Sequence, residues 1–408
     1  MALKFPIFMD AQSTTPCDPR VVEAMLPYFT EKFGHPASRN HPFGWEAEAA
    51  VDLGRQRLAT LIGARDPKEL VFTSGGTESI NLAIKGVAEM YREKGNHIVT
   101  TAIEQRAGLD VCKRLERQGF EVTYVPVQPD GLIDVDDIRK AITDKTILIS
   151  VMFANNEIGT IQDIAAIGKL AKEKAILFHT DATQAVGKIP VDVEAMGIDL
   201  LSCTAHLVYG PKGVGALYVR RKGPRVRLAP MIDGGGHERG MRSGTLPVPL
   251  IVGFGRAAEI CRESLAEEGP RLAKLRDRLQ EMILSSVDEA FLNGRPDRRL
   301  PQNLNISFAY VEGESVLMGL NRETALSSGS ACTSSTLEPS YVIAALGASA
   351  ELAHSSIRFS LHRFTTAEEI EYVGQRTIEV IKRLRDMSPL YELAKEGIDI
   401  KSIQWKAE

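Results

Sequence analysis

The middle of the chain alternates β-rich runs with amphipathic helical segments, and this alternation limits the possible folds more than any other feature. Helical patterns at 108–118 and 134–143 separate runs that are rich in β-branched and aromatic residues. Those runs span residues 96–104, 121–128, 145–159, 175–187 and 213–221. Because strands that alternate with helices pair in parallel, the pattern predicts an α/β domain with a mainly parallel, doubly wound sheet.

A second, smaller domain is predicted from about residue 263. The pattern over 263–287 is typical of a long helix, which leads into further strand-like runs. No repeat, low-complexity tract or long linker interrupts the chain, so we expect one compact protomer. We expect residues 14–262 to form the large domain, and residues 1–13 and 263–408 to form a smaller α+β domain.

Composition and charge exclude several classes of protein. The formal net charge of the 408 residues is −4, so the chain lacks the basic footprint of a nucleic-acid-binding protein. No apolar run approaches the roughly 20 residues of a membrane span, and the first residues lack a signal core, so we expect no membrane partner and a cytoplasmic location. The five cysteines are spaced singly, so each is expected to be either buried packing or a reagent.

Two short motifs are candidates for a cofactor site. "TSGGTES" (73–79) lies where a predicted strand passes into a helix, and its glycines would let a phosphate approach the N–H groups of the helix N-terminus. A plain tight turn explains this motif equally simply. "HTDATQ" (179–184) ends an apolar run at Asp181. This aspartate could cap a helix, or it could be a buried carboxylate that keeps a heteroaromatic nitrogen protonated.

Three further segments carry polar chemistry. Cys332 lies in the small, polar segment "SGSACTSS" (328–335), which suits an accessible thiol. Arg358 is set inside an apolar run, where an arginine is usually paired with a carboxylate from the protein or from a substrate. The Gly-rich loop at 234–246 contains two arginines and is too polar for a core, so we expect it to contact an anion or a partner chain.

Taken together, these motifs resemble the cysteine desulfurases of the NifS/IscS-like group, which are pyridoxal-phosphate proteins of fold type I. The resemblance covers essentially the whole chain. It is carried by "FMDAQSTTPCDPRV", "ASRNHPFGWEAEAAV", "FTSGGTESINLAIKG", "NNEIGTIQDIAAIG", "HTDATQAVGK", "GGGHERGMRSGTLP", "SSGSACTS", "EPSYV" and "SPLYELAKEGIDIKSIQW". It implies a large domain built on a mainly parallel seven-stranded sheet, which is the cofactor-binding domain, plus the smaller α+β domain.

The resemblance also implies a set of phosphate contacts. Gly76 and Thr77 match the phosphate-binding turn of these proteins, and Thr204 and His206 match further phosphate contacts. Thr245 matches a contact that the family donates from the second subunit. The resemblance therefore implies a homodimer.

Other matched positions concern the cofactor ring and the substrate. Asp181 matches the acid that pairs with the pyridine nitrogen, while Gln184 and Asn156 match residues that contact the O3′ oxygen and the substrate. Arg358 matches the residue that binds the carboxylate of L-cysteine. Cys332 matches the thiol that attacks the substrate sulfur and carries it away as a persulfide.

The sequence departs from the family at positions that matter for catalysis. Leu207 stands where the family has the lysine that forms the Schiff base with the cofactor and moves the substrate proton. Gln105 replaces the ring-stacking histidine and cannot carry a proton near neutral pH. His35, Ile80 and His362 replace residues usual in the family, and we expect all five changes to gather near the cofactor rather than to scatter.

Leu207 cannot form a Schiff base, and Lys212, five positions further on, lies in a turn that would have to be rebuilt to replace the missing amine. We therefore expect catalysis to involve Cys332, Gln105 and His206 at most, with pyridoxal phosphate bound noncovalently or absent.

Three functional hypotheses remain open. The chain could act in sulfur transfer for iron–sulfur cluster assembly, with impaired or altered catalysis and Cys332 as the sulfur carrier. It could instead be a non-catalytic partner that binds an IscU-like scaffold protein through residues 388–405, which resemble the family's docking segment, or that supports a transient iron–sulfur cluster with Cys332 as a metal ligand. A third possibility is a different reaction in a changed pocket.

Overall fold

The computed structural model describes residues 3–328 and 339–396. Cys332 and the last part of the predicted docking segment, 397–405, lie outside the described residues. Within the described residues, no helix is both long enough and apolar enough to cross a membrane.

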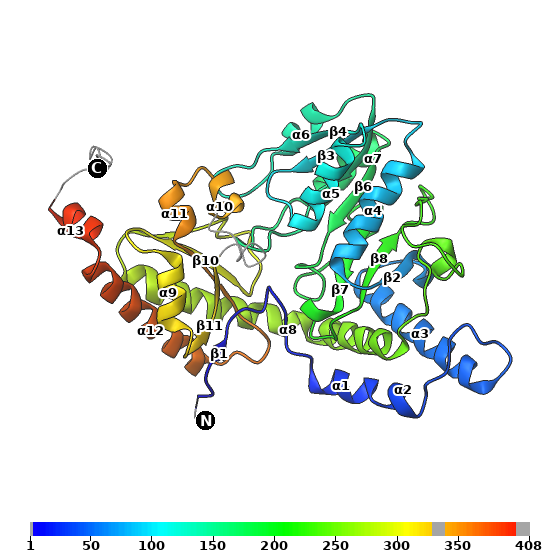
Figure 1. Ribbon diagram of the computed structural model, residues 1–408, viewed down its shortest axis with the longest axis horizontal. Coiled ribbons are helices and arrows are strands. Elements are labelled where there is room, and N and C mark those ends of the chain that lie inside the picture. The colour runs from blue at the N-terminus through cyan, green and yellow to red at the C-terminus, as the bar shows by residue number, and fades with distance from the viewer. Residues whose placement is uncertain (1–2, 329–338, 397–408) are drawn as a thin grey trace.

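A seven-stranded sheet forms the centre of the large domain, as predicted (Figure 1). Its strands, in spatial order, are β2 (Leu70–Thr73), β8 (Gly215–Val219), β7 (Leu200–Thr204), β6 (Leu177–Asp181), β5 (Thr146–Ser150), β3 (His97–Thr101) and β4 (Glu121–Val125). Only β8 runs antiparallel to its neighbours, β2 and β7. The remaining pairs are parallel, so the expected mainly parallel topology is confirmed.

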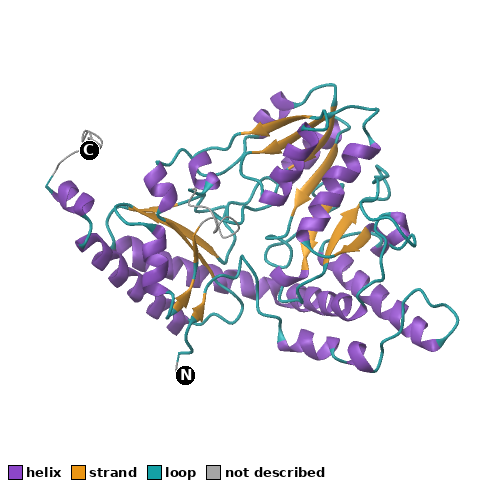
Figure 2. Cartoon of the chain, in the orientation of Figure 1, coloured by secondary structure: helices purple, strands orange, loops and turns teal. Residues whose placement is uncertain are grey.

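Helices cover both faces of this sheet (Figure 2). Successive strand residues point to opposite faces, so Leu148 packs in one core cluster and its neighbour Ile149 in another. The cluster around Leu148 includes residues of α4 (Gly76–Met90) and α5 (Arg106–Glu116). The other cluster draws on α3 (Pro42–Leu61), α6 (Val135–Ala141), α7 (Ile164–Glu173) and the start of α8 (Val248–Ser286). Burial on both faces explains why these strands are continuous apolar runs.

The small domain has its own sheet and core. The antiparallel sheet consists, in order, of β12 (Ser327–Ser328), β13 (Ser356–Ser360), β10 (Asn303–Phe308) and β9 (Ala290–Leu292). The N-terminal strand β1 (Ile7–Phe8) pairs in parallel with β11 (Thr324–Ala325). Helices α9 (Gly313–Leu320) and α12 (Ala367–Asp386) pack on this core. The remaining helices are α1 (Pro19–Met25), α2 (Pro27–Thr30), α10 (Tyr341–Ala345), α11 (Ala350–His354) and α13 (Pro389–Lys395).

Helix α8 joins the two domains (Figure 1). It starts at Val248, fifteen residues before the helix that the sequence pattern predicts, because its first turns are apolar and buried in the large domain. Its later residues Leu272 and Leu279 lie in the core of the small domain. Since the helix is continuous through residue 262, the domain boundary at that position stays a prediction.

A buried ion pair fixes the loop at 234–246 against the large domain. The guanidinium of Arg55 donates to both carboxylate oxygens of Glu238, at 2.6 and 2.8 Å. The backbone N–H of Phe72 donates to the same carboxylate at 2.7 Å. Both charged side chains are buried, so removal of either one would leave the other as a buried charge without compensation.

We expect Glu238→Ala to lower the free energy of unfolding by about 3–5 kcal/mol, because it leaves the buried Arg55 guanidinium without its partner. Urea denaturation followed by circular dichroism measures this change. Arg278→Ala, which breaks the exposed Arg278–Glu371 pair, is the matched control and should leave the midpoint almost unchanged. Equal midpoints for the two variants would contradict the prediction.

Candidate active site

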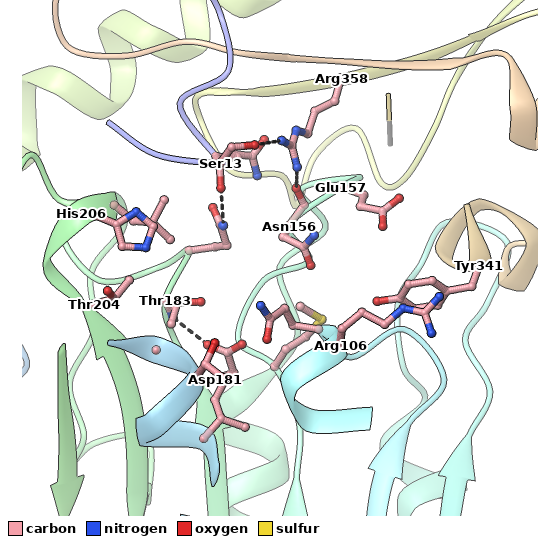
Figure 3. A pocket seen from close by; sticks show the side chains of 18 residues that line it. Ser13, Arg106, Asn156, Glu157, Asp181, Thr183, Thr204, His206, Tyr341 and Arg358 are labelled. Carbon is pink, nitrogen blue, oxygen red and sulfur yellow. Dashed lines mark hydrogen bonds between the residues drawn. The ribbon is translucent and has the colours of Figure 1, made fainter. Parts of the chain in front are cut away.

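A cavity of about 280 Å³ lies at the carboxyl ends of the central strands, between the two domains (Figure 3). Asp181 is the last residue of β6, and Thr204 is the last residue of β7. Arg358 reaches the cavity from β13 of the small domain. The carboxyl ends of parallel strands are the usual place for ligands in open α/β sheets.

Asp181 is a buried carboxyl group facing this cavity. Its Oδ1 accepts a hydrogen bond from the backbone N–H of Thr183 at 3.0 Å. Burial raises the pKa of Asp181 above its ordinary value. Turns follow Asp181, and the next helical turn begins only at Ala205, so the interpretation of Asp181 as a helix cap is wrong.

The other end of the cavity is suited to a phosphate. Helix α4 begins at Gly76, and a Cβ placed on Gly76 would lie 2.8 Å from the side chain of Thr183. Only glycine therefore fits here without movement, and Gly76, the first residue of the helix, lines the cavity. Thr77 and Thr204 also line it. Such a helix N-terminus binds anions through its N–H groups and its dipole.

His206 lines the same cavity, and its Nδ1 lies 3.3 Å from the hydroxyl of Thr14. Burial lowers the pKa of His206, which keeps the imidazole uncharged near neutral pH. Thr245 is not among the lining residues of its own chain; it is exposed, with its hydroxyl 3.4 Å from Nε2 of His35. A contribution of Thr245 to the site of a second subunit therefore stays a prediction.

Leu207 lies directly on the cavity wall. It belongs to the single helical turn Ala205–Leu207 and is 6% exposed. No lysine of the described residues lines the cavity; Lys212 does not reach it. The described part of the chain therefore presents an apolar side chain, and no primary amine, to a ligand in this position.

The expected gathering of the family departures holds for three of the five positions. Gln105 and Ile80 line the cavity together with Leu207. His35 lies by Thr245 instead, and His362 is buried between the rings of Phe8 and Phe364. The expectation is therefore wrong for His362, which packs between aromatic rings and does not line the cavity. For His35 it stays a prediction, because His35 lies beside Thr245, the residue expected to reach the site of a second subunit.

The side chain of Gln105 is held in place by a hydrogen bond to the backbone of helix α5, which begins directly after it. It is the residue before α5, and its Oε1 accepts a hydrogen bond from the N–H of Ala107 at 3.1 Å. The side chain caps the helix and lines the cavity at once. It offers polar contacts there but cannot transfer a proton near neutral pH.

Arg358 is buried and already has protein partners. Its Nη2 donates to Oδ1 of Asp10 and to the hydroxyl of Ser13, both at 2.7 Å, and its Nη1 donates to the backbone carbonyl of Asn156 at 2.9 Å. Gln184 donates through Nε2 to the backbone carbonyl of Gln12. The Arg358 Nε and the Asn156 Oδ1 are buried without a hydrogen-bond partner, and both residues line the cavity.

The sequence-based prediction missed several cavity residues. They are Gln12, Ser13, Arg106, Met152, Glu157, Thr183 and Tyr341. Two signals in the sequence could have found most of them: membership of a motif that carries the family resemblance, or a position next to a predicted site residue. Arg106, for example, directly follows Gln105.

The residues present fit pyridoxal phosphate in all but one respect. A buried carboxyl group is available for the ring nitrogen, and a helix N-terminus with a glycine that tolerates no side chain is available for the phosphate. Among the residues that the structure describes, none that lines the cavity offers an amine for the covalent link, and Leu207 occupies the wall. The donor set therefore suits a noncovalently bound cofactor.

The sheet order and these cavity residues define a fold type I pyridoxal-phosphate protein. The sequence pattern of the family described as aminotransferase class-V matches residues 7–373. The cysteine desulfurase IscS of Mannheimia succiniciproducens is 57% identical over 407 residues, which is 99% of this chain and 100% of the relative. The chain therefore belongs to the cysteine desulfurases of the class-V aminotransferase family.

Solved structures agree with this assignment. A structure titled "NifS-like protein" superposes with a TM-score of 0.85 and 37% identity, covering 93% of this chain and 100% of the other. A structure titled "SspA in complex with cysteine" has a TM-score of 0.78 and 38% identity, covering 88% and 100%. The family and the fold expected from the sequence are thus confirmed.

The carboxyl group of Glu104, behind the cavity, predicts a pH dependence of stability. Its Oε1 accepts hydrogen bonds from the Thr101 hydroxyl at 2.7 Å and from the Met152 N–H at 2.9 Å. Burial raises the pKa of Glu104 from 4.5 to about 8. Between these two values the folded protein keeps a proton that the unfolded chain has released, so stability falls as the pH rises.

We expect Glu104→Gln to remove this contribution, because an amide is neutral in both states. The variant should lose less stability than the wild type between pH 5 and pH 8, by at most about 1.4 kcal/mol per pH unit. Urea denaturation at several pH values measures the difference. Glu371→Gln, on the exposed face of α12, is the control, and its stability should depend on pH as that of the wild type does. If the stability of Glu104→Gln fell with pH as steeply as that of the wild type, Glu104 would not be the source of the pH dependence.

Proposed function

We propose that the chain is a cysteine-desulfurase-like protein of sulfur transfer and iron–sulfur cluster assembly, in which release of sulfur from L-cysteine is strongly impaired or altered. The observation that carries this proposal is Leu207 on the cavity wall, where no described lysine is present. The names of the relatives, and a similar structure titled as a complex with cysteine, support the substrate class.

The roles that we propose for the individual residues follow from their chemistry. Asp181 would pair with the ring nitrogen of pyridoxal phosphate, and the N-terminus of α4, with Thr77 and Thr204, would hold the phosphate. When bound, this cofactor supplies an electron sink for reactions at amino-acid carbons. Arg358 would bind the α-carboxylate of cysteine through its free Nε. Cys332, the expected sulfur carrier, lies outside the described residues.

The same residues explain why turnover should be slow. The apolar side chain of Leu207 can neither hold the cofactor nor move a proton between substrate atoms. The neighbouring Gln105 cannot replace it as an acid or base. Loss of a positioned acid–base group alone typically costs about 10²–10⁴-fold in rate.

A non-catalytic docking role is the second candidate function. No side chain of α13 is buried, so its described residues are available to a partner such as an IscU-like scaffold protein. This observation supports a chain that binds the scaffold, or helps to hold a transient iron–sulfur cluster through Cys332, without turning over cysteine. The two candidates share the family and differ in whether cysteine is consumed.

We expect Leu207→Lys to restore covalent cofactor binding. The wild type should release all pyridoxal phosphate on denaturation after borohydride treatment, whereas the lysine variant should retain it in the polypeptide mass. Persulfide formation from cysteine should rise by at least about 100-fold in the variant. Leu207→Met, which preserves size without an amine, is the matched control and should behave like the wild type.

Two outcomes would change this proposal. A borohydride-stable adduct on the wild type would show that another amine reaches the cofactor, and the ordinary reaction would then be the better account. If the wild type forms no persulfide but retains the scaffold protein on a resin, the docking role is favoured. If it also fails to retain the scaffold, both candidates are refuted.

We also propose a homodimer, built on an apolar face of the first helices. Leu26, Phe29 and Phe33 are exposed on and beside α1 and α2, and Phe43 and Trp45 are exposed at the start of α3. Single exposed apolar residues are common, but a group of this size usually marks an interface.

We expect Phe29→Glu combined with Phe33→Glu to convert the dimer into a monomer, because each added charge would have to be buried in the interface. Sedimentation velocity measures the mass in solution. Met318→Glu is the matched control, since Met318 is at least as exposed but lies on α9 of the small domain. A dimer that persists in the double variant would place the interface elsewhere.

A further inference from the structure

Two arginines face the same cavity from opposite domains (Figure 3). Arg358 enters from the small domain, and Arg106 is the first residue of α5 in the large domain. Asn156 and Glu157 lie between them. Both arginines line the cavity, and in each the Nε is buried without a hydrogen-bond partner.

The charges of the two guanidinium groups are compensated very differently. Arg358 is paired with the Asp10 carboxylate at 2.7 Å and donates two further hydrogen bonds. Arg106 makes no ion pair or hydrogen bond with any described residue; its guanidinium stacks on the ring of Tyr341, with 4.6 Å between Cζ and the ring centroid. Stacking holds the group in place without neutralising its charge.

Glu157 carries the carboxyl group that could pair with Arg106, but this group is hydrogen-bonded to another residue. The Ser340 hydroxyl donates to its Oε2 at 2.5 Å. Burial raises the pKa of Glu157 to about 7, so at pH 6 the group is largely uncharged. A half-buried guanidinium with an unpaired N–H is costly unless an anion supplies the partner.

We propose that Arg106 is a second anion-binding residue of this cavity, so that the site accepts amino acids carrying an acidic group in the side chain. The α-carboxylate would bind at Arg358, as the proposed function requires, and the side-chain acid would bind at Arg106. Arg106 is thus assigned a role in specificity, and the ligand class is an amino acid with two carboxylates.

Equilibrium binding tests this assignment without any turnover. Isothermal titration calorimetry at pH 6, on the full chain with and without pyridoxal phosphate, compares L-aspartate with L-asparagine and L-glutamate with L-glutamine. Each pair differs only in the charged group. We expect at least one acid to bind about ten- to a hundredfold more tightly than its amide, as one charge-assisted hydrogen bond would provide.

Variants at position 106 then locate the effect. Arg106→Gln should abolish the preference for the acid and leave amide binding unchanged, whereas Arg106→Lys should keep part of the preference because it keeps the charge. Arg114→Gln removes the same charge from an exposed position at the far end of α5 and should keep the full preference. Arg106 is half-buried and Arg114 is exposed, so neither substitution leaves a hole in the core.

The proposal is overturned if neither acid binds more tightly than its amide, or if the preference survives in Arg106→Gln. These results are distinct from failure of the proposed function. A chain that forms no persulfide from cysteine, yet binds the acid through Arg106, would retain this inference and lose the sulfur-transfer proposal.

Discussion

The whole site depends on burial of both faces of the parallel sheet. Because helices cover each face, the polar groups of the strands can meet a ligand only at the strand ends. Asp181 and Thr204 end two neighbouring strands and therefore come to the same edge. The turn at Gly76 approaches this edge so closely that it has no room for a side chain. A cofactor-shaped cavity thus follows from the packing of the sheet.

Within this frame, Leu207 presents an apolar side chain on the wall of the cavity. The neighbouring groups that suit a phosphate and a ring nitrogen are all retained around it. Burial lowers the pKa of His206 and raises the pKa of the carboxyl groups of Asp181 and Glu157. Asp10 compensates the charge of Arg358, so Arg106 is the guanidinium of the cavity that has no carboxylate partner among the described residues. The site is therefore better suited to binding anionic ligands than to moving protons.

The sequence predicted the large elements well because their signals are local. Continuous apolar strands and intervening amphipathic helices indicated the sheet, and family motifs indicated the positions of Gly76, Asp181 and Arg358. Predictions of which residues far apart in the sequence come together in the fold were less successful. His362 packs between aromatic rings and does not line the cavity. Arg106 was missed although it directly follows Gln105, because adjacency in the sequence does not show that two neighbouring side chains line the same cavity.

The sequence by itself therefore determined the fold class and the family, and it places a leucine at position 207, since each is encoded in contiguous residues. Only the tertiary structure decided which charged side chains form ion pairs with one another. Asp10 lies 348 residues from the Arg358 that it neutralises, whereas Arg106 finds no such partner among the described residues. Such pairs depend on how distant segments of the chain pack together, and no local pattern carries that information.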